Sequence, residues 1–539
     1  MSALTGTGRL VLLALRRDRF TLGAWLLVLT VLTAAFTSMA VDGLRTPRDI
    51  VTQTHFMAVN PAMRLMSLSA GPNVGAYTMS RSYVTLAILA AVMSVLAVVR
   101  HTRQNEETGR AELLGAGVVG RTAGPAAAVV VTLGANLVLA PLLGLAMIVM
   151  GRPVASSLAA GAAIAAVGVV FTAVAAVTSQ LCSTARGANG LAMAALAAAF
   201  VLSAVGNMQG RVDAAGLVAF SAWPTWLSPI GWGYQMRPFG GDHWWLLGLF
   251  GLFTAIPLAA AYRLAARRDL GRGLLSEHAG RAEASAALLR PLGLTWRLQR
   301  PAFLAWLIGL LGFGPIFGSV SQSARGMEGT ARQWYQHMGG TTHLLDAFFT
   351  SMIEMAGMAV AVYVVQVLLR MREEEARGRL EPVLAASVSR PRWAMSYVLS
   401  AVLGAVALLV AFAVSMALAA GQLLGGTPGL LRELTGAAVA QLPGVLVIAG
   451  AVVVVVALLP RWAGLVSWLV LGAAVLTGPM FGPSLRLPQL VQDVSPFTHS
   501  PRVPAGEVSA LAIVALVAVS VTLAAAGIAA LRRRDTVPA

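Results

Sequence analysis

Long apolar stretches alternate with short polar stretches along the whole chain. Each apolar stretch has about the 20 residues that an α-helix needs to cross the hydrocarbon core of a membrane, and the stretches are continuous rather than alternating as in a spanning β-barrel. The pattern therefore predicts an all-α integral membrane protein with twelve transmembrane helices. The predicted spans are residues 21–40, 82–99, 124–149, 154–181, 188–207 and 243–265 in the first half, and 303–323, 348–369, 393–420, 436–459, 462–481 and 507–531 in the second.

The twelve spans form two groups of six. Because an even number of spans returns the chain to its starting side, the two halves have the same orientation and are parallel repeats. We predict a first transmembrane half at 1–265, a cytoplasmic linker at 266–291 and a second transmembrane half at 292–539. A short apolar segment flanked by Arg opens each half, at residues 9–17 and 292–300. We interpret these segments as interfacial helices rather than as the cytoplasmic ends of the spans that follow them.

The distribution of charged residues predicts how the chain is oriented in the membrane. Charged residues make up 11% of the chain, against about 25% in a soluble domain. With the N-terminus in the cytoplasm, 27 of the 39 basic residues fall on the cytoplasmic side, as the positive-inside rule requires. We therefore expect a multi-pass protein with both termini cytoplasmic. The net charge of +17 is explained by Arg that faces anionic membrane lipids, so we expect membrane lipids and no nucleic acid among the partners.

Two segments on the opposite side combine aromatic residues with proline. They are residues 223–234 and 487–504, in which Ser228-Pro229 and Ser495-Pro496 occupy matching places. Proline and glycine prevent a continuous helix there, while Trp and Tyr favour the membrane interface. A surface loop with an aromatic belt and a re-entrant hairpin both fit, and the high apolar content favours the hairpin.

A charged motif occurs twice, after the second span and after the eighth. It reads Glu-Glu-Thr-Gly-Arg-Ala-Glu-Leu-Leu at residues 106–114 and Glu-Ala-Arg-Gly-Arg-Leu-Glu-Pro-Val at residues 375–383. The copies are 269 positions apart, so that Gly109 corresponds to Gly378. A solvated charge run accounts for most of the glutamates, but not for the recurrence of Gly-Arg-x-Glu in equivalent loops. We interpret the glycine as a tight turn, followed by a short helix that pairs with a partner and inserts its apolar side chains.

The residue types that catalysis on this chain would need are missing. No residue is Lys, so the chain cannot form a P-loop, and if ATP drives the protein another chain must hydrolyse it. Cys182 is the only cysteine, which excludes an internal disulfide. The seven histidines have neither HExxH nor clustered metal-ligand spacing. We therefore expect no enzymatic activity, no metal and no cofactor on this chain.

The motif Glu-Glu-x-Gly-Arg-x-Glu-Leu-Leu, ending at an Arg before the third span, resembles the coupling-loop signature of permease subunits of ABCG-like (type V) ABC exporters. The resemblance covers almost the whole chain: an interfacial helix, six spans with the motif between the second and third, and a re-entrant segment before the sixth, all twice. The twelve-span, single-chain form is similar to actinobacterial permeases called exporters of polyketide antibiotics, including the tetronasin-resistance type. The resemblance implies a location in the bacterial cytoplasmic membrane.

In that family a short coupling helix docks into a cleft of the ATPase subunit. By resemblance, residues 109–115 and 378–384 have this role, with Arg121 and Arg390 closing the loops. The first loop departs from the pattern because Gly120, where the family often has Ser, precedes its Arg, so the two docking sites are not expected to be equal. The implied coupling residues are Glu106, Glu107, Gly109, Arg110, Glu112, Leu113, Leu114 and Arg121 in the first loop, and Glu374, Glu375, Gly378, Arg379, Glu381, Val383, Leu384 and Arg390 in the second.

These features predict the transmembrane permease subunit of an ATP-driven exporter of lipophilic compounds, whether drugs, antibiotics or lipid-like molecules. The expected partners are two copies of a separate ABC ATPase subunit, which bind ATP and Mg, together with the lipophilic substrate. A proton-coupled secondary transporter with two six-span halves is the first alternative. A membrane enzyme acting on lipids, and an importer or lipid-extrusion protein, are further alternatives.

The substrate path is the least specified feature. Glu354, the clearest acid inside a span, lies 16 residues before Arg370, or about 24 Å along a helix, and hence near the outer interface. Such an acid indicates a function or simply reaches water, and both interpretations stay open. The nearby apolar side chains form either an adaptable wall or ordinary packing. By resemblance, the second, fifth, eighth and eleventh spans line the substrate path. The candidate residues of this path are Phe200, Asn207, Phe349, Glu354, Met355, Met358, Trp468 and Phe481.

Overall fold

The computed structural model describes residues 2–269, 271–275, 283–324, 344–386, 388–483, 487–506 and 508–534. The chain forms two units, Met1–Ala279 and Gly280–Ala539, and each is described by itself. Within the described part, eleven helices are long and apolar enough to cross a membrane. The protein is therefore an all-α, multi-pass membrane protein, as the apolar pattern predicts.

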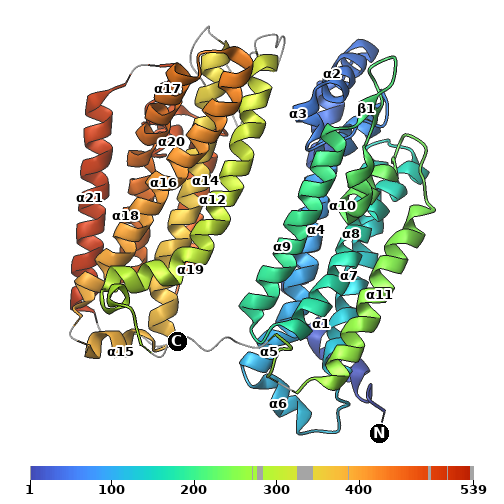
Figure 1. Cartoon of the computed structure of the whole chain (residues 1–539), viewed down its shortest axis with the longest axis horizontal. Helices are drawn as coiled ribbons and strands as arrows, with labels where there is room; N and C mark the ends of the chain where they lie inside the picture. Colours follow the sequence, from blue (N-terminus) through green and yellow to red (C-terminus); the bar gives the residue numbers. More distant parts are fainter. Residues whose placement is uncertain are drawn as a thin grey trace. The chain divides into compact units, whose positions relative to one another are not determined.

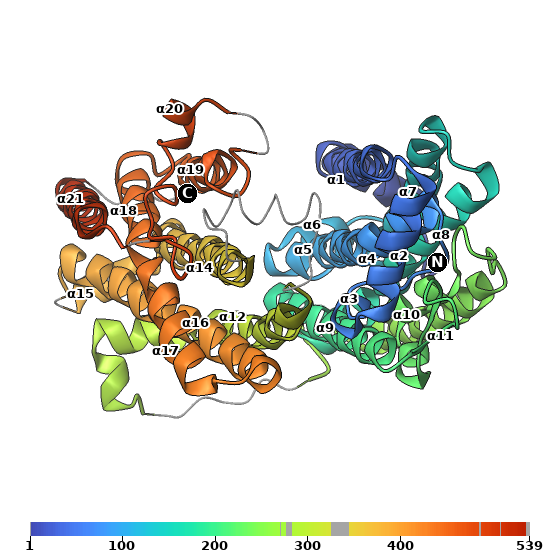
Figure 2. The same cartoon turned by 90° about the horizontal axis from the view of Figure 1, so that it is seen from above.

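The first unit contains the blue to green helices of Figure 1, of which α4 and α8 are the most buried among the candidate spans. Figure 2 shows α4 between α1 and α9. The elements are α1 (Thr7–Gly43), α2 (Pro47–Val59), α3 (Pro61–Arg64), α4 (Val74–His101), α5 (Arg103–Glu107), α6 (Arg110–Gly115), α7 (Ala123–Val149), α8 (Val154–Leu181), α9 (Ala185–Met208), strands β1 (Arg211–Val212) and β2 (Ala219–Phe220), the 3₁₀-helix η1 (Trp223–Leu227), α10 (Pro229–Gln235) and α11 (Leu246–Arg267).

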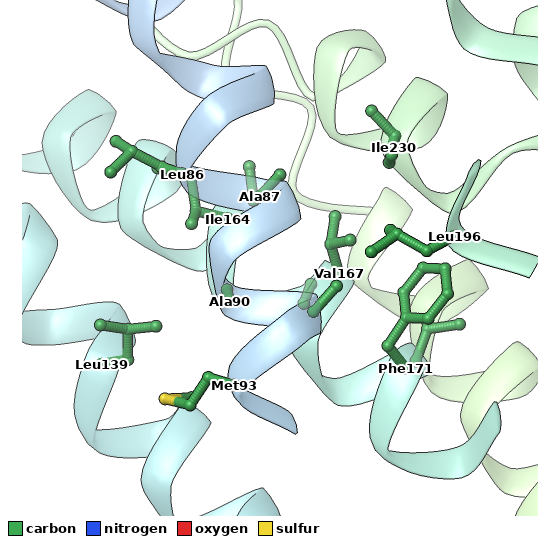
Figure 3. Close-up of a cluster of buried hydrophobic side chains, with 14 of the residues drawn as sticks. Leu86, Ala87, Ala90, Met93, Leu139, Ile164, Val167, Phe171, Leu196 and Ile230 are labelled. Atoms are coloured by element: carbon green, nitrogen blue, oxygen red, sulfur yellow. The ribbon is translucent and has the colours of Figure 1, made fainter. Parts of the chain in front are cut away.

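Small side chains let the central helices of this unit approach closely. A Cβ added at Gly161 would meet the α7 backbone at Ala140, so only glycine fits at this crossing, as is common where membrane helices pack. Larger apolar side chains fill the remaining space. Figure 3 shows this core, with Leu86, Ala87, Ala90 and Met93 from α4, Leu139 from α7, Ile164, Val167 and Phe171 from α8, Leu196 from α9 and Ile230 from α10.

The second unit repeats this plan, with α14 in the place of α4. Figure 2 shows α14 surrounded by α12, α16, α18 and α19. The elements are the 3₁₀-helix η2 (Ala286–Leu289), α12 (Pro291–Ala324), α14 (Leu344–Ala376), α15 (Leu380–Ala385), α16 (Arg390–Leu424), α17 (Thr427–Ala440), α18 (Leu442–Leu458), α19 (Ala463–Thr477), α20 (Gln489–Gln492) and α21 (Ala510–Arg533).

Several helices differ in length from the predicted spans. Helix α4 begins eight residues earlier than expected because the side chain of Asn73 accepts a hydrogen bond from the Ala76 N–H (2.8 Å) and caps it. Helix α19, at the predicted eleventh span, has only 15 residues. At 1.5 Å per residue it is shorter than the roughly 30 Å hydrocarbon core.

The two segments predicted as interfacial helices are continuous with the spans that follow them, as the first turns of α1 and α12. Helix α12 contains Pro301 and Pro315. Figure 1 shows that its first turns run at a large angle to the rest of the helix. Proline removes a backbone hydrogen bond and bends a helix. Part of the predicted linker, namely residues 270 and 276–282, lies outside the described residues.

The two Ser-Pro segments make the same contact in each unit. Ser228 donates a hydrogen bond to the carbonyl oxygen of Ala199 on α9, and Ser495 donates one to the carbonyl oxygen of Ala474 on α19, both at 2.6 Å. All four residues lie in buried positions. The matching bonds support the internal repeat at the level of single side chains.

Candidate functional site

The repeated motif forms the same local structure in both units. Gly109 and Gly378 have φ angles of +71° and +68°, a left-handed conformation that favours glycine. A Cβ at either position would meet nothing within 4 Å, so the backbone conformation rather than a lack of space requires glycine. The short helices α6 and α15 begin directly after these turns.

Helix α6 has no buried residue, and all of its residues except the half-buried Ala111 are exposed. Leu113 is 78% exposed, and the side chains of Arg110 and Glu112 are exposed beside it. Leu114, also predicted to insert into a partner, is exposed as well. Leu113 and Leu114 together give α6 an exposed apolar surface next to its charged side chains.

Helix α15 is less exposed than α6. Leu380 is buried, and Val383 and Leu384 are half-buried, while Arg379 and Glu381 are exposed. The two helices therefore present similar charges but different amounts of apolar surface. Whether the two loops dock with unequal strength stays a prediction.

Behind α6, the carboxylate of Glu106 lies between two arginines. Arg268 donates to it through Nη2 to Oε1 (2.6 Å) and Nη1 to Oε2 (3.0 Å), and Arg103 donates through Nη1 to Oε2 (2.8 Å). All three side chains are buried. We call these three residues the Glu106 cluster. Loss of the Glu106 carboxylate would leave the two buried guanidinium groups without a counter-charge.

Backbone carbonyls accept further hydrogen bonds from both arginines of this cluster, although Arg268 Nε has no partner among the described residues. Arg103 donates from Nε to the oxygen of Ser179, near the end of α8, and from Nη2 to that of Arg272 (3.0 Å). Arg268 donates to the same Arg272 oxygen (2.6 Å). The cluster thus joins α5, which directly follows α4, with the end of α8 and the segment after α11.

The second unit contains the equivalent arrangement, the Glu375 cluster of Arg372, Glu375 and Arg534. Arg534 donates from Nη2 to both carboxylate oxygens of Glu375 (2.6 Å each), and Arg372 Nη1 lies 3.5 Å from Oε2. Arg372 also donates to the oxygen of Pro460 (2.9 Å), and Arg534 to that of Val456 (3.1 Å). Helices α14, α18 and α21 are joined here as α4, α8 and α11 are in the first unit.

The arginine that closes each loop binds to its cluster. Arg121 donates a hydrogen bond to the carbonyl oxygen of Arg268 (2.7 Å), and Arg390 donates one to that of Arg534. Arg268 and Arg534 are the residues directly after α11 and α21. Each loop is therefore fixed at its beginning by a glutamate and at its end by an arginine, both attached to the same residue.

The other glutamates of the motif have different surroundings. Glu107 is exposed and accepts a hydrogen bond from the N–H of Ala185 at the start of α9 (2.8 Å). Glu374 is buried, 3.6 Å from Arg379 and 3.9 Å from Arg370. A solvated charge run describes the exposed Glu107, Glu112 and Glu381, but not Glu106, Glu374 and Glu375, whose buried carboxylates lie against arginines of this chain.

Sequence reasoning missed four members of the two clusters. Arg103 and Arg372 have the same spacing of 269 positions as the motif glycines, and this spacing was the available signal. Arg268 and Arg534 are 266 positions apart and follow the last span of each half, far from the motif. No local pattern connects them with the glutamates that they bind.

The substrate-path candidates are placed in both units. Phe200, half-buried on α9, packs against the core of the first unit. Asn207 is buried and accepts hydrogen bonds from Ser221 (2.8 Å) and Thr225 (3.3 Å), so it holds the segment before α10. In the second unit, Phe349 and Met358 are buried, Met355 is half-buried, and Trp468 and Phe481 are exposed.

Glu354 is 3% exposed. Within the described part of the chain, neither of its carboxylate oxygens has a hydrogen-bond partner. One turn earlier, Thr350 accepts a hydrogen bond from the N–H of Ala505 (3.0 Å). Arg502, in the same connecting segment as Ala505, acts electrostatically on Glu354. A functional role for these candidates stays a prediction.

Comparison with known proteins identifies relatives along almost the whole chain. The family described as "Multidrug efflux system permease Rv1217c, C-terminal domain" matches residues 9–262 and 288–532. The multidrug efflux system permease protein Rv1217c of Mycobacterium tuberculosis (strain ATCC 25618 / H37Rv) is 36% identical over 542 residues, covering 99% of this chain and 96% of the relative.

Proposed function

The chain belongs to the family of the multidrug efflux permease Rv1217c, and we propose that it is the membrane subunit of an ATP-driven exporter of lipophilic compounds. The observation that carries the proposal is the pair of matching buried clusters, each behind a short helix with exposed charged residues. A permease without a P-loop receives work from another chain through such surfaces. Two corresponding surfaces, one in each unit, fit two copies of a separate ABC ATPase subunit, which bind ATP and Mg.

In this proposal α6 and α15 are the coupling helices. The exposed Glu112 and Glu381 pair with the ATPase, and the apolar side chains of Leu113, Leu114, Val383 and Leu384 insert into it. Glu106 and Glu375 are positioning residues, because their buried carboxylates contact arginines of this chain. Displacement of either helix then acts on three helix ends at once, as in a two-state rigid-body transition.

The proposed substrates are lipophilic drugs, antibiotics or lipid-like molecules. The relative's name describes a multidrug efflux system, and a broad substrate range fits apolar and thioether side chains that adapt their shape. Phe349, Met355 and Met358 supply such side chains next to Glu354. The proposed setting is the bacterial cytoplasmic membrane, with the α6 and α15 ends and both termini in the cytoplasm.

Affinity purification of the tagged full-length chain from its native membrane tests this proposal. We expect a P-loop ATPase to co-purify, and ATP to drive uptake of a lipophilic dye into inside-out vesicles. Replacing Leu113 by Asp should release the ATPase. Leu490→Asp is the matched control, because Leu490 is 84% exposed on α20, outside both loops. Dye transport that follows the proton gradient and ignores ATP would overturn the proposal.

Glu354 favours a second candidate function, proton-coupled export. A buried carboxylate without a hydrogen-bond partner among the described residues is a group that could carry a proton. This alternative predicts that the proton gradient alone drives transport and that Glu354→Gln abolishes it.

A further inference from the structure

A cavity of about 700 Å³ lies in the first unit beside α6. This volume is in the range of sites that hold small molecules or part of a lipid. Its walls come from the first turns of α1, from α6 and from the beginning of α7. The cavity therefore lies against one of the proposed coupling helices, on the side of that helix that faces its own unit.

A much smaller cavity lies among the described residues beside α15 in the second unit. There about 10 Å³ remains between Leu380, Arg390, Trp393 and Leu531, which is room for one water at most. The sequence explains this difference. At the spacing of 269 positions, Leu380 corresponds to Ala111 and Trp393 corresponds to Gly124.

The two small residues of the first unit keep its cavity open. Ala111 and Gly124 both line the large cavity, and a Cβ added at Gly124 would meet nothing within 4 Å. Leu380 and Trp393 are both buried in the second unit and occupy the equivalent volume. The first unit thus has small side chains where the second unit has large ones.

The wall of the cavity carries positive charge without matching acids. Arg17 and Arg110 both line it and repel each other electrostatically, and neither forms an ion pair among the described residues. The one acid in the wall, Glu106, is already bound by two arginines. Asp18, next to Arg17, is held by His101 (2.7 Å) and Arg100 (3.2 Å). An anion is therefore the ligand that this charge pattern fits.

Another part of the wall is apolar and continues onto the exposed surface of α1 and α7. Leu10, Leu13, Pro125 and Ala128 line the cavity, and Leu13 is also 51% exposed. On the same helix as Pro125, the side chain of Val130 is exposed as well. A ligand with an anionic head and an apolar tail can satisfy both parts of such a site.

We propose that this cavity binds one anionic phospholipid, with its phosphate between Arg17 and Arg110 and its first acyl carbons along α1 and α7. The bound lipid contacts Arg110, Ala111 and Leu114 and so holds α6 in place. If α6 is a coupling helix, as the proposed function has it, lipid composition regulates coupling through the first loop alone.

Lipid binding to the purified full-length protein in detergent tests the site without any transport assay. The probes are short-chain phosphatidylglycerol, phosphatidylcholine of the same chain length, and glycerol phosphate, which is a headgroup without a tail. We expect phosphatidylglycerol to bind at least about tenfold more tightly than the other two, since charge-assisted hydrogen bonds and acyl contacts each contribute that much. Equal binding of phosphatidylcholine, or of glycerol phosphate, overturns the proposal.

Filling the cavity gives a second, independent measurement. Gly124→Trp together with Ala111→Leu reproduces the second unit, and we expect it to weaken phosphatidylglycerol binding about tenfold or more. The matched control is Gly134→Trp, on the same helix, where a Cβ also meets nothing within 4 Å and which does not line the cavity. Arg17→Gln leaves the space open and should remove the preference for the anionic lipid. Unchanged binding in both variants overturns the site, whatever the transport assays give.

Discussion

The carboxylate of Glu106 lies 2.6 Å from the guanidinium of Arg268, although 162 positions of sequence separate the two residues. Arg534 binds Glu375 at the same distance across 159 positions. In each unit the contact connects the charged motif after the second membrane span with the end of the last span. The paired contacts make the clusters the first place to test how the loops are held.

Removal of Arg268 should destabilise the first loop. Arg268→Gln removes both hydrogen bonds that Glu106 accepts from Arg268, while Arg103 still pairs with the carboxylate, so we expect a cost of about 2 kcal/mol. The measurement is hydrogen exchange over residues 102–121, which should become faster in the variant. Arg267→Gln is the matched control, because Arg267 is exposed and adjacent. Adding Glu106→Gln to Arg268→Gln should lower the protection further, because the buried Arg103 then lacks its carboxylate. Restored protection would contradict the pairing of Arg103 with Glu106.

The left-handed glycines should be needed for the geometry of the loops. Gly109→Ala and Gly378→Ala each force a side chain into a positive φ, at a cost of about 1 kcal/mol. Gly115→Ala is the control, since it lies in α6 without a positive φ and a Cβ there meets nothing within 4 Å. Hydrogen exchange of α6 and α15 checks the difference. Equal exchange in Gly109→Ala and Gly115→Ala would contradict it.

Charge reversal on the coupling helices should separate ATP hydrolysis from transport. Glu112→Arg together with Glu381→Arg places like charges against the proposed ATPase surface, and like charges across an interface cost several kcal/mol. We expect transport to fall by about tenfold or more while the chain still inserts. The measurement is ATP hydrolysis and dye uptake in the same vesicles. Coupling that stays at the wild-type value removes these residues from the docking role.

Replacement of Glu354 should change both stability and selectivity. Glu354→Gln removes a buried charge without a hydrogen-bond partner among the described residues, so we expect a gain of about 1 kcal/mol in stability. We also expect export of cationic dyes to fall relative to neutral dyes. Thermal unfolding in detergent and paired transport assays measure the two effects. A loss of stability would indicate that the carboxylate makes contacts essential to the fold.

The segment before η1 should respond to acid through Asp213. Its carboxylate accepts N–H bonds from Val218 (2.9 Å) and Leu217 (2.7 Å), which hold the pKa of Asp213 below its ordinary value. Because folding lowers this pKa, the bonds stabilise the segment above the unfolded pKa of about 3.9, and this is lost as the pH falls through the folded pKa. Pepsin cleavage at residues 213–220 should therefore rise with acid. In Asp213→Asn it should vary less with pH.

The sequence by itself determined the helical membrane fold and much of the loops. Apolar stretches of about 20 residues leave a chain in lipid little choice but helix, because backbone groups there must be paired within the segment. The glycines of the motif are equally local, since a positive φ at Gly109 and Gly378 depends on the residue itself. Both features could be predicted because their causes lie within a few neighbouring positions.

Only the tertiary structure decided which charges of the motif face outward. Glu106 and Glu112 look alike in sequence, yet Glu106 is bound inside by Arg268 while Glu112 is exposed. The partner of Glu106 comes from the end of another helix, and an ion pair forms only where packing brings the two groups together. The cavity beside α6 has the same origin. Ala111 and Gly124 are small side chains in the sequence, and they became a site only where α1, α6 and α7 left the space between them open.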